Sequence, residues 1–477
     1  MQLSEDLIRG VVQEVLSRIG EVSPTDAGSA RPCRGGRGTN GVYRDADSAV
    51  SAAERAFQAY RTRPLEDRRA AIDRIRAICL DQAEELGRME LDETKIGRLD
   101  HKIAKLKVAA ERVPGVEYLR TENASGDSGL TLTDYSPFGV IGAITPVTHS
   151  LPTLAGNAIN MLAAGNTVVF NAHPSGAKVA AEGVRRFNQA ICDAIGLDDL
   201  LTIIDPPTLE SATALFEHRG VRLLVVTGGP AVARAALASN RRAIVAGPGN
   251  PPVVVDTTAD LELAAKSIVE GAAFDNNLLC IGEKQVFAVA LIFDKLMDAV
   301  ARHGGFRLDS ERIAALTRAA FKKDDKGKLV VDKDLVGRDP AILGEHAGAR
   351  VPDGTQILFG ETSADHPFVD HEQMMPFIPF VRVENVDRAI ELAKSSEHGY
   401  GHTAILHSRD TGTMTRMGKA MDCTIFVVNG PSVAGLGLGG EGSLSFSIAG
   451  PTGEGVTTPL TFCRQRRTSI VGGFRFV

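Results

Sequence analysis

The chain has 477 residues, which is enough for two or three folding units of about 100–200 residues each. Hydrophobic residues make up 43% of it and charged residues 23%, the balance of a globular protein and not of a disordered one. The net charge of −6, with scattered basic residues, argues against a nucleic-acid groove, and the longest apolar run, 286–293, is far shorter than the ~20 residues of a membrane span. These properties favour chemistry on small molecules.

Residues 1–20 are predicted to form an amphipathic helix. Apolar residues recur at helical spacing between Leu3 and Ile19, and Gly20 follows them as a stop signal. Acidic residues interrupt the apolar stretch, so it does not read as a secretory signal. Residues 21–41 are rich in Gly, Pro, Ser, Thr and Arg, which predicts a flexible linker. The helix either folds back onto the protein or docks on a partner.

Helical patterns fill residues 45–118, and the pattern changes after Asp134. Short β-branched runs then alternate with alanine-rich helical stretches. The runs are Val140–Ile144, Thr167–Phe170, Leu200–Ile204, Leu223–Val226 and Val253–Val255. This alternation predicts an α/β fold with a doubly wound parallel sheet and a nucleotide site at the carboxyl ends of its strands.

The six cysteines lie far apart and form no Cys-x-x-Cys pair, which suits a reducing cytoplasm and leaves one of them as a candidate nucleophile. Cys280 stands at the end of the segment Phe274-Asp-Asn-Asn-Leu-Leu-Cys280. A cysteine beside apolar residues is more often a core residue. Asn276, Asn277 and Gly282 instead favour a polar turn whose amides stabilise an anion.

The apolar run that begins at Leu223 continues through Thr227, Gly228 and Gly229 into a helical stretch. Glycine lets the backbone approach a phosphate, and a helix N-terminus offers unpaired amides. Many such turns contain glycine for steric reasons alone, and this one matches neither Gly-x-Gly-x-x-Gly nor the P-loop. The late histidines, between residues 366 and 407, lack the spacing of zinc ligands, so no metal site is predicted.

Eight segments in fixed order carry a family resemblance. They are Phe138–Pro146, Met161–Phe170, His173–Pro174, Val226–Pro230, Ala246–Val254, Phe274–Cys280, Glu372–Pro376 and Val428–Pro431. From about Asp45 to its end the chain resembles the aldehyde dehydrogenase superfamily, and within it the CoA-acylating branch of bacterial microcompartments for propanediol or ethanolamine utilisation. The resemblance implies a Rossmann-type cofactor domain over 42–252, an α/β catalytic domain over 253–445 and a return segment over 446–477.

The resemblance implies that Cys280 attacks an aldehyde to form a thiohemiacetal, which loses hydride to NAD and becomes a thioacyl-enzyme. It also implies that the alkoxide is stabilised by hydrogen bonds from the Cys280 amide and from Thr148, which stands where hydrolytic relatives carry Asn. It names Asn277 as a further donor. It also implies a set of residues that contact the cofactor: Thr145, Pro146, His173, Pro174, Thr227, Gly228, Gly229, Val232, Gly247 and Glu372. Glu372 matches the glutamate that binds the nicotinamide ribose.

Hydrolytic members of the superfamily hold a glutamate general base at the position of Ala246, so coenzyme A is expected to accept the acyl group here. The expected substrate is propionaldehyde, acetaldehyde or lactaldehyde. His149 departs from the Asn-Pro of the branch and is expected to influence the aldehyde pocket or the CoA geometry. The alternatives are a hydrolytic enzyme that releases the free acid and an inactive cargo protein that binds a shell.

Residues 1–20 also resemble the encapsulation peptides of such enzymes, which implies docking on a shell protein and a place in the lumen of a cytoplasmic microcompartment. The family forms dimers or tetramers by strand exchange. Residues 121–136 and the tail 463–477 are the candidate arms. No membrane or nucleic-acid partner is expected.

Overall fold

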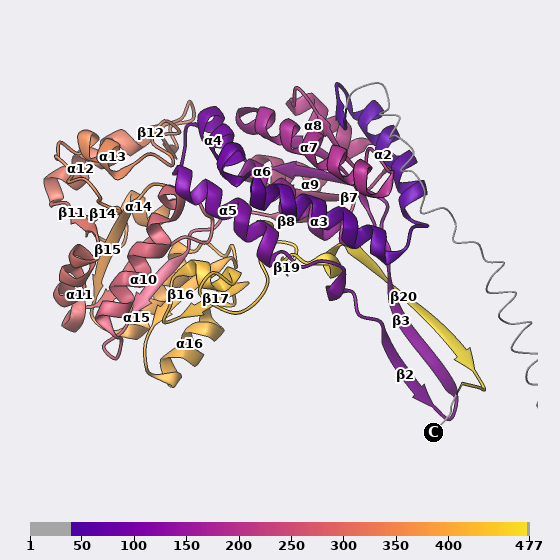
Figure 1. The fold of residues 1–477 in the computed structure, drawn as a ribbon. Coiled ribbons are helices and arrows are strands. Elements are labelled where there is room, and N and C mark those ends of the chain that lie inside the picture. Colours follow the sequence, from indigo (N-terminus) through magenta and orange to yellow (C-terminus); the bar gives the residue numbers. More distant parts are fainter. Residues whose placement is uncertain (1–39, 475–477) are drawn as a thin grey trace, which may run out of the picture.

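The computed structural model describes residues 40–474, in two α/β domains and a projecting β arm (Figure 1). The predicted helix over 1–20, and all but the last two residues of the linker over 21–41, lie outside the described residues. Each domain is built on a parallel sheet with helices packed against it, which confirms the predicted fold class. Within residues 40–474, none of the helices is both long and apolar enough to span a bilayer.

The first sheet has six parallel strands in the order β1-β6-β5-β4-β7-β8. Their bounds are β1 (Val42–Tyr43), β4 (Val140–Thr145), β5 (Thr167–Ala172), β6 (Leu201–Ile204), β7 (Val221–Thr227) and β8 (Ala243–Ala246). The four runs predicted between residues 140 and 226 are confirmed as β4, β5, β6 and β7.

Side chains alternate across this sheet into two cores, as successive residues of a strand must. Leu223 and Val225 of β7 enter one core, and Leu224 and Val226 enter the other. The first core is shared with α3 (Leu65–Asp81), α4 (Ala83–Thr94), α5 (Leu99–Arg112), α6 (Ser150–Ala163) and α7 (Ala177–Ile195). The second is shared with α2 (Ala46–Tyr60), α8 (Leu209–Glu217) and α9 (Pro230–Ala238). Helices therefore cover both faces of the sheet.

The second sheet has seven parallel strands in the order β11-β14-β15-β10-β9-β16-β17. The strands are β9 (Pro252–Val255), β10 (Gln285–Val289), β11 (Gly305–Arg307), β14 (Ile357–Glu361), β15 (Phe377–Val383), β16 (Thr403–His407) and β17 (Ile425–Val428). The helices of this domain are α10 (Leu261–Ala273), α11 (Ala290–Arg302), α12 (Ser310–Ala320), α13 (Pro340–His346), α14 (Pro367–Asp370), α15 (Val386–Ser396) and α16 (Thr411–Met421). The run predicted at 253–255 is confirmed as part of β9.

Short elements complete the domains. They are the hairpins β12 (Phe321–Lys323) with β13 (Leu329–Val331) and β18 (Ile448–Ala449) with β19 (Gly455–Val456), and the 3-10 turns η2 (Val116–Tyr118), η3 (Pro174–Gly176), η4 (Phe274–Asn277), η5 (Ser432–Leu436) and η6 (Pro459–Phe462). After β17 the chain returns to the first domain, where the Leu444 amide donates to Arg112 O.

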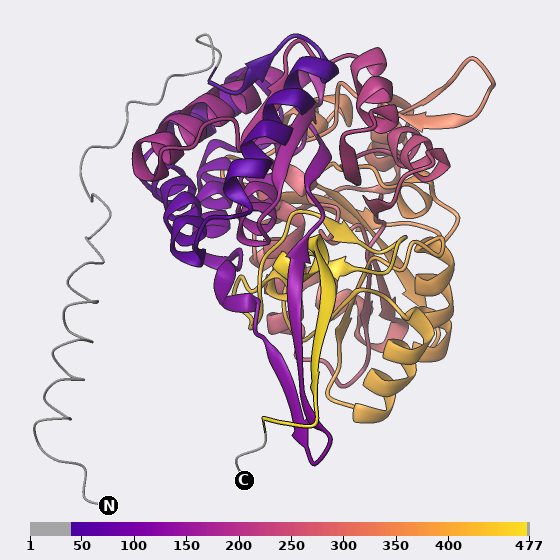
Figure 2. The same cartoon turned by 90° about the vertical axis from the view of Figure 1, so that its right-hand side faces the viewer.

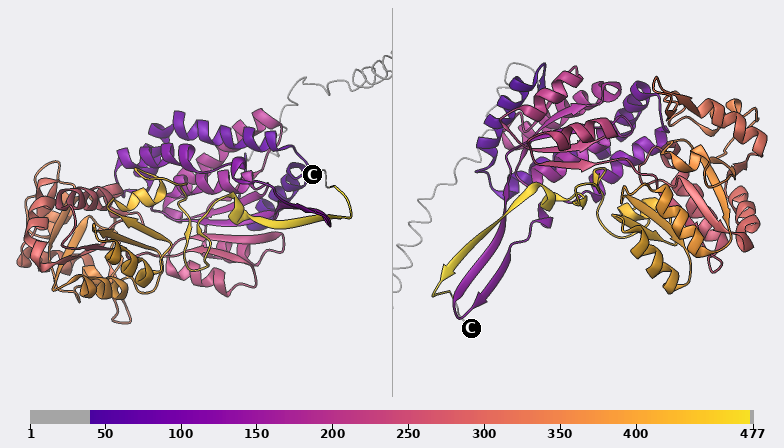
Figure 3. Two further views of the ribbon diagram at one scale, coloured as in Figure 1. Left: turned by 90° about the horizontal axis from the view of Figure 1, so that it is seen from below. Right: turned by 180° about the vertical axis from the view of Figure 1, so that it is seen from behind.

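The arm is an antiparallel sheet of β2 (Glu122–Gly126), β3 (Gly129–Pro137) and the C-terminal strand β20 (Cys463–Val471). It extends away from both domains in every view (Figures 1, 2 and 3). Most of its side chains are partly or fully exposed, Val471 by 85%. Both candidate arm segments named from the sequence thus contribute strands to one projecting sheet, the second through residues 463–471.

Loops from opposite edges of the two sheets face each other between the domains. Thr148 follows β4 at the carboxyl edge of the first sheet, and Cys280 precedes β10 at the amino edge of the second. Helix α5 lies against both loops, because Lys105 contacts residues 148 and 275. This region holds the candidate site.

Candidate active site

Cys280 ends a backbone turn of unusual conformation, residues 274–280, which we call the cysteine turn. Helix α10 stops at Ala273, and three residues in succession, Asp275, Asn276 and Asn277, then have positive φ angles of 51°, 55° and 64°. The left-handed region costs a residue other than glycine about 1–2 kcal/mol, and Asn and Asp tolerate it best. Because the turn contains no glycine before Cys280, other contacts must hold it.

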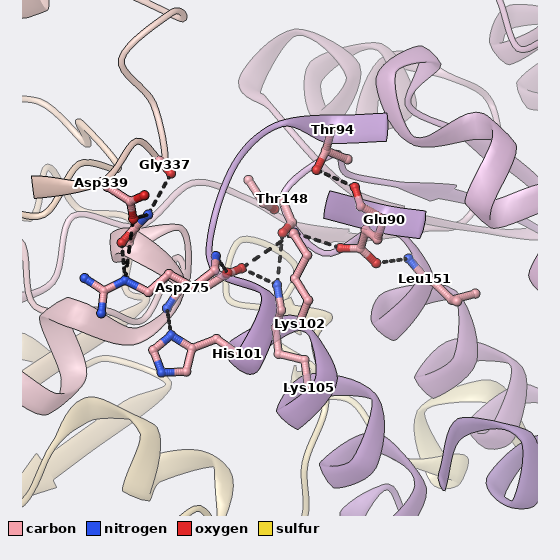
Figure 4. A network of polar contacts seen from close by, with 12 residues as sticks. Glu90, Thr94, His101, Lys102, Lys105, Thr148, Leu151, Asp275, Gly337 and Asp339 are labelled. Atoms are coloured by element: carbon pink, nitrogen blue, oxygen red, sulfur yellow. Dashed lines mark hydrogen bonds and ion pairs between the residues drawn. The ribbon is translucent and has the colours of Figure 1, made fainter. Parts of the chain in front are cut away.

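Asp275 anchors the start of the cysteine turn to helix α5 (Figure 4). Its carboxylate accepts hydrogen bonds from Lys105 Nζ at 2.5 Å and from the Arg98 amide at 2.8 Å. Its own amide donates to His101 Nδ1 at 2.9 Å. Desolvation works to raise the pKa of this buried carboxyl, but the opposing charges of Lys105 and Lys102 leave it below its ordinary value. Asp275 is therefore a buried residue fixed by two contacts of its carboxylate and one of its amide.

The two asparagines are held in the same way. Asn276 Nδ2 donates to Gly337 O at 3.0 Å and to Asp339 Oδ1 at 2.9 Å, and Asn276 Oδ1 accepts from Arg98 Nε at 2.6 Å. Asn277 Nδ2 donates to Glu283 O at 2.8 Å, and its Oδ1 accepts from Lys284 Nζ. Both ends of the Asn277 amide are thus held by residues just after the turn, while the second Nδ2 hydrogen remains, so its donation to the alkoxide stays a prediction.

Cys280 is half-buried at the end of this turn, between a cation and an anion. Burial, reinforced by the negative charge of Glu372, raises the pKa of the Cys280 thiol to about 12, and Lys284 opposes that rise. Burial also raises the pKa of Glu372 to about 7 and lowers the pKa of Lys284 to about 8. Without substrate, Cys280 is therefore a neutral thiol, and the nearby Glu372 carboxyl titrates near pH 7.

Gly249 separates Cys280 from His402. The Gly249 amide donates to Glu372 Oε1 at 3.3 Å, and a β-carbon added at Gly249 would lie 2.6 Å from Cys280 O and 3.0 Å from His402 Cγ. The closeness of three segments around one glycine shows that cysteine, carboxylate and imidazole share one site. The sequence analysis did not single out Gly249 or His402.

His402 is a buried imidazole with one free nitrogen. Its Nδ1 lies 2.8 Å from Thr403 Oγ1, its amide donates to Glu397 Oε1 at 2.9 Å, and in the described structure its Nε2 is buried without a partner. Burial and the charge of Lys284 lower the pKa of His402 to about 4, so the ring is neutral at pH 7. The only local signal in the sequence was a glycine and a histidine, Gly401-His402, directly before the apolar run that forms β16.

The loop after β4 presents Thr148 and His149 opposite the cysteine turn. Thr148 is half-buried, and its carbonyl accepts from Lys105 Nζ at 3.1 Å (Figure 4). His149 is 4% exposed and lies against Phe446, with ring centroids 5.4 Å apart. Over residues 40–474, His149 Nδ1 and the hydroxyls of Thr145 and Thr153 are buried polar atoms without a partner. Such atoms usually mark a place for water or ligand.

The predicted cofactor residues gather at the carboxyl ends of neighbouring strands. Thr145 ends β4 and Pro146 follows it, and Thr227 ends β7 and is followed by Gly228 and Gly229. His173 and Pro174 follow β5, and Gly247 follows β8. Since these strands are adjacent in the order β5-β4-β7-β8, their ends form one row. Val232 lies in the first turn of α9, and Glu372 reaches the site from the second domain.

The Gly228–Gly229 turn leaves backbone open to a ligand. Gly229 begins α9 without a side-chain cap, and a β-carbon added there would meet nothing within 4 Å. A separate hollow of about 550 Å³ lies at the C-terminal ends of α8 and α9, lined by residues that include Phe216, Arg219, Ala235 and Ala238. Open amides at a helix N-terminus fit a dinucleotide phosphate. Beside this turn Ala246, 5% exposed, ends β8 and supplies no carboxylate.

Comparison with known proteins gives concordant results. The sequence profile of the Aldehyde dehydrogenase family matches residues 36–443. The chain is 46% identical to the acetaldehyde dehydrogenase (acetylating) EutE of Salmonella typhimurium, over 92% of this chain and 94% of that protein.

Solved structures with a similar fold include two propionaldehyde dehydrogenases. The propionaldehyde dehydrogenase of Rhodopseudomonas palustris with bound propionyl-CoA is 45% identical, with a TM-score of 0.88 over 91% of this chain and 96% of that one. A propionaldehyde dehydrogenase from the fucose utilisation bacterial microcompartment of Clostridium phytofermentans is 40% identical, with a TM-score of 0.89 over 92% of this chain and 100% of that one.

Proposed function

This chain belongs to the aldehyde dehydrogenase family, and we propose that it converts a short aldehyde, NAD and coenzyme A to acyl-CoA and NADH through a thioester on Cys280. The observation that carries the proposal is a half-buried cysteine at the end of an anchored turn, with Glu372 and His402 close to it around Gly249 and alanine at the position of the hydrolytic base. The similarity to acetylating and propionyl-CoA-bound relatives supports the same acceptor.

In the first half-reaction Cys280 Sγ attacks the aldehyde carbon after losing its proton. A thiol with a pKa of about 12 needs a nearby acceptor, and Glu372, with a pKa of about 7, is the candidate. The alkoxide is held by the Cys280 amide and the Thr148 hydroxyl. Bound NAD supplies the acceptor for hydride. As the C–H bond breaks, the oxygen re-forms its double bond, and the acyl group stays on Cys280 as a thioester.

In the second half-reaction His402 removes the thiol proton of coenzyme A. Its free Nε2 is neutral at pH 7 and can accept that proton, while Thr403 holds the opposite nitrogen. The thiolate attacks the acyl carbon, and Cys280 leaves as the thiolate. Ala246 offers no base to a competing water, so hydrolysis is expected to be slow.

The deciding experiment withholds coenzyme A. Enzyme mixed with aldehyde and NAD should release about one NADH per site in a burst, followed by a slow phase, and added CoA should restore turnover with acyl-CoA as product. Repeated fast turnovers to free acid without CoA would establish the hydrolytic alternative. Absence of both burst and turnover would establish the inactive cargo alternative.

The polar atoms beside Thr148 favour an aldehyde that carries a hydroxyl group, of which lactaldehyde is the smallest chiral example. His149 Nδ1 and Thr153 Oγ1 lie one helical turn apart, buried and without partners in the described chain. His149→Phe keeps the ring contact with Phe446 and removes the ring nitrogen that would bond the hydroxyl group of the aldehyde. It should lower the ratio of kcat/KM for lactaldehyde to that for propionaldehyde by about tenfold or more. An unchanged ratio would exclude this assignment.

For location and partner, the proposal is a microcompartment enzyme that residues 1–20 attach to a shell protein. The apolar residues at helical spacing followed by a polar linker support it, as does a similar enzyme from a fucose utilisation microcompartment. Deletion of 1–20 should leave kinetics in solution within about twofold and abolish co-purification with shells. A soluble, folded deletion variant without activity would contradict it.

For assembly, the proposal is a homodimer or a pair of dimers joined through the arm. The exposed outer strands β2 and β20 support this, because free strand edges and Val471, 85% exposed, invite pairing with a second copy. Val471→Asp should shift the mass in analytical ultracentrifugation towards the monomer, and an unchanged mass would exclude this contact.

A further inference from the structure

We propose that Lys105 is a positioning residue that fastens the cysteine turn to the Thr148 loop and so sets the rate of hydride transfer. The inference rests on the proposed function, because it assumes that Cys280 and Thr148 act on the same aldehyde. Lys105 touches neither of the reacting groups directly. It acts through Asp275 and through the Thr148 carbonyl.

The geometry joins three segments that are distant in the sequence (Figure 4). Lys105 Nζ donates to Asp275 Oδ2 at 2.5 Å, across 170 residues, and to Thr148 O at 3.1 Å, across 43 residues. The side chains of Lys105 and Asp275 are fully buried. One ammonium group therefore bridges the loop of the first domain and the turn of the second.

Lys102 provides an internal comparison. It is also fully buried and lies one turn earlier on α5, but its ammonium bonds Glu90 at 3.1 Å and lies 3.9 Å from Asp275. Glu90 in turn accepts from the Leu151 amide at 3.2 Å. Two ammonium groups and two carboxylates thus balance in charge, yet only Lys105 contacts the Thr148 carbonyl. A buried ion pair is by itself weak evidence of a stabilising role, so the second contact needs its own explanation.

Strain in the cysteine turn supplies that explanation. Asp275 is the first of its three residues with positive φ, and its carboxylate is held by Lys105 and by the Arg98 amide. Without Lys105 the turn could relax, and Thr148 would lose its link to it. A displacement of about 1 Å between a nucleophile and an oxyanion donor is enough to cost about 10²-fold in rate.

The experiment measures the single-turnover burst of NADH with saturating aldehyde and NAD. Lys105→Met should slow the burst about 10²-fold, which is also the loss we expect for Thr148→Val, with the KM for NAD within about twofold. The control Lys102→Met/Glu90→Gln removes a buried ion pair of the same cluster while keeping an acceptor for the Leu151 amide. Its burst should stay within about threefold of wild type.

Variants in which Asp275 is also neutral separate the positioning role of Lys105 from its role in charge balance. They also allow the test if Lys105→Met alone does not fold. Asp275→Asn alone leaves Lys105 beside Thr148 and should slow the burst by less than about tenfold. Lys105→Met/Asp275→Asn removes both charges, so its Tm should recover towards wild type while its burst stays at least about tenfold below that of Asp275→Asn.

The outcomes are distinguishable. The proposal would be overturned if Lys105→Met/Asp275→Asn recovered both its Tm and its burst rate. It would also be overturned if the Lys102 control lost as much burst rate as Lys105→Met. Either result would mean that Lys105 serves only to balance the charge of Asp275. Failure of the wild-type burst would instead reject the proposed function. Iodoacetamide alkylation of Cys280, which needs no alkoxide donor, should change less than the burst if Lys105 acts mainly through Thr148.

Discussion

The cysteine turn and the Gly228–Gly229 turn solve opposite problems in the same active site. The Gly228–Gly229 turn makes few contacts: Gly229 starts α9 without a cap, and space is open beside it. The cysteine turn has no glycine between Phe274 and Cys280, and its left-handed path is held by Lys105 of α5, by the Arg98 amide and by the Gly337 carbonyl. One turn must leave its backbone free for a ligand, whereas the other must hold an atom still.

This difference implies that the two turns should respond differently to mutation. A small change at the open turn should disturb only what binds there. A small change around the cysteine turn should move a reacting atom, because the turn is closely packed and fixed by hydrogen bonds. The following variants test this contrast.

The largest effect is expected at Cys280 itself. Cys280→Ala removes the nucleophile, so NADH formation should fall by at least about 10³-fold in a steady-state assay. Cys79→Ala is the matched control, since Cys79 is fully buried in the core and burial raises the pKa of its thiol to about 12. Substantial turnover by Cys280→Ala would remove the cysteine turn from the chemistry altogether.

The next largest effect is expected at Gly249. The methyl group of Gly249→Ala would lie 2.6 Å from Cys280 O and 3.0 Å from His402 Cγ, so both segments must move. We expect kcat to fall about 10²-fold in a variant that still folds. Circular dichroism and Tm verify the fold, and a variant with normal kcat would show that the cysteine turn has slack after all.

At the open turn Gly229→Ala should have a smaller and different effect. The added methyl meets no protein atom within 4 Å, so Tm and the rate of Cys280 alkylation should stay unchanged. It does project where a phosphate would approach the backbone, and we expect KM for NAD to rise about tenfold, equivalent to about 1.4 kcal/mol. A loss confined to kcat would mean that the two turns are not separate in function.

The smallest effect is a change in thiol acidity. The negative charge of Glu372 helps raise the pKa of Cys280 to about 12, so Glu372→Gln should lower that pKa and speed alkylation by iodoacetamide several-fold at pH 8. Lys284→Met should change the rate in the opposite direction, because Lys284 favours the thiolate. Equal rates in wild type and Glu372→Gln would show that the two groups are not coupled.

Parts of this site follow from local sequence alone. The β-branched runs predict β4, β5, β6 and β7, since a buried parallel strand needs such residues wherever it lies. Thr227-Gly228-Gly229 likewise predicts a strand, an open turn and a helix start from neighbouring residues. His402 and Gly249 were missed, because a histidine before a strand and a glycine among prolines have many ordinary roles when their neighbours in space are unknown.

Asn277 shows that sequence can indicate a turn without indicating the contacts of its side chains. The sequence indicates a polar turn before Cys280, and the turn exists, but it cannot say where an amide points. Only the positions of Glu283 and Lys284 decide that Asn277 faces into the turn. These contacts hold the conformation of the backbone, and the donation of Asn277 to the alkoxide stays a prediction.

The sequence by itself determined the α/β class, the order of the strands along the chain, the family resemblance and the identity of Cys280 as the candidate nucleophile, because these depend on residues that are neighbours or on motifs read in order. The tertiary structure decided which groups surround that sulfur. Lys105 lies in a helical stretch where nothing local distinguishes it from Lys102, and its role arises only when folding brings Thr148 and Asp275 to the same ammonium group. Contacts across 170 residues depend on how two domains pack, and no local pattern encodes them.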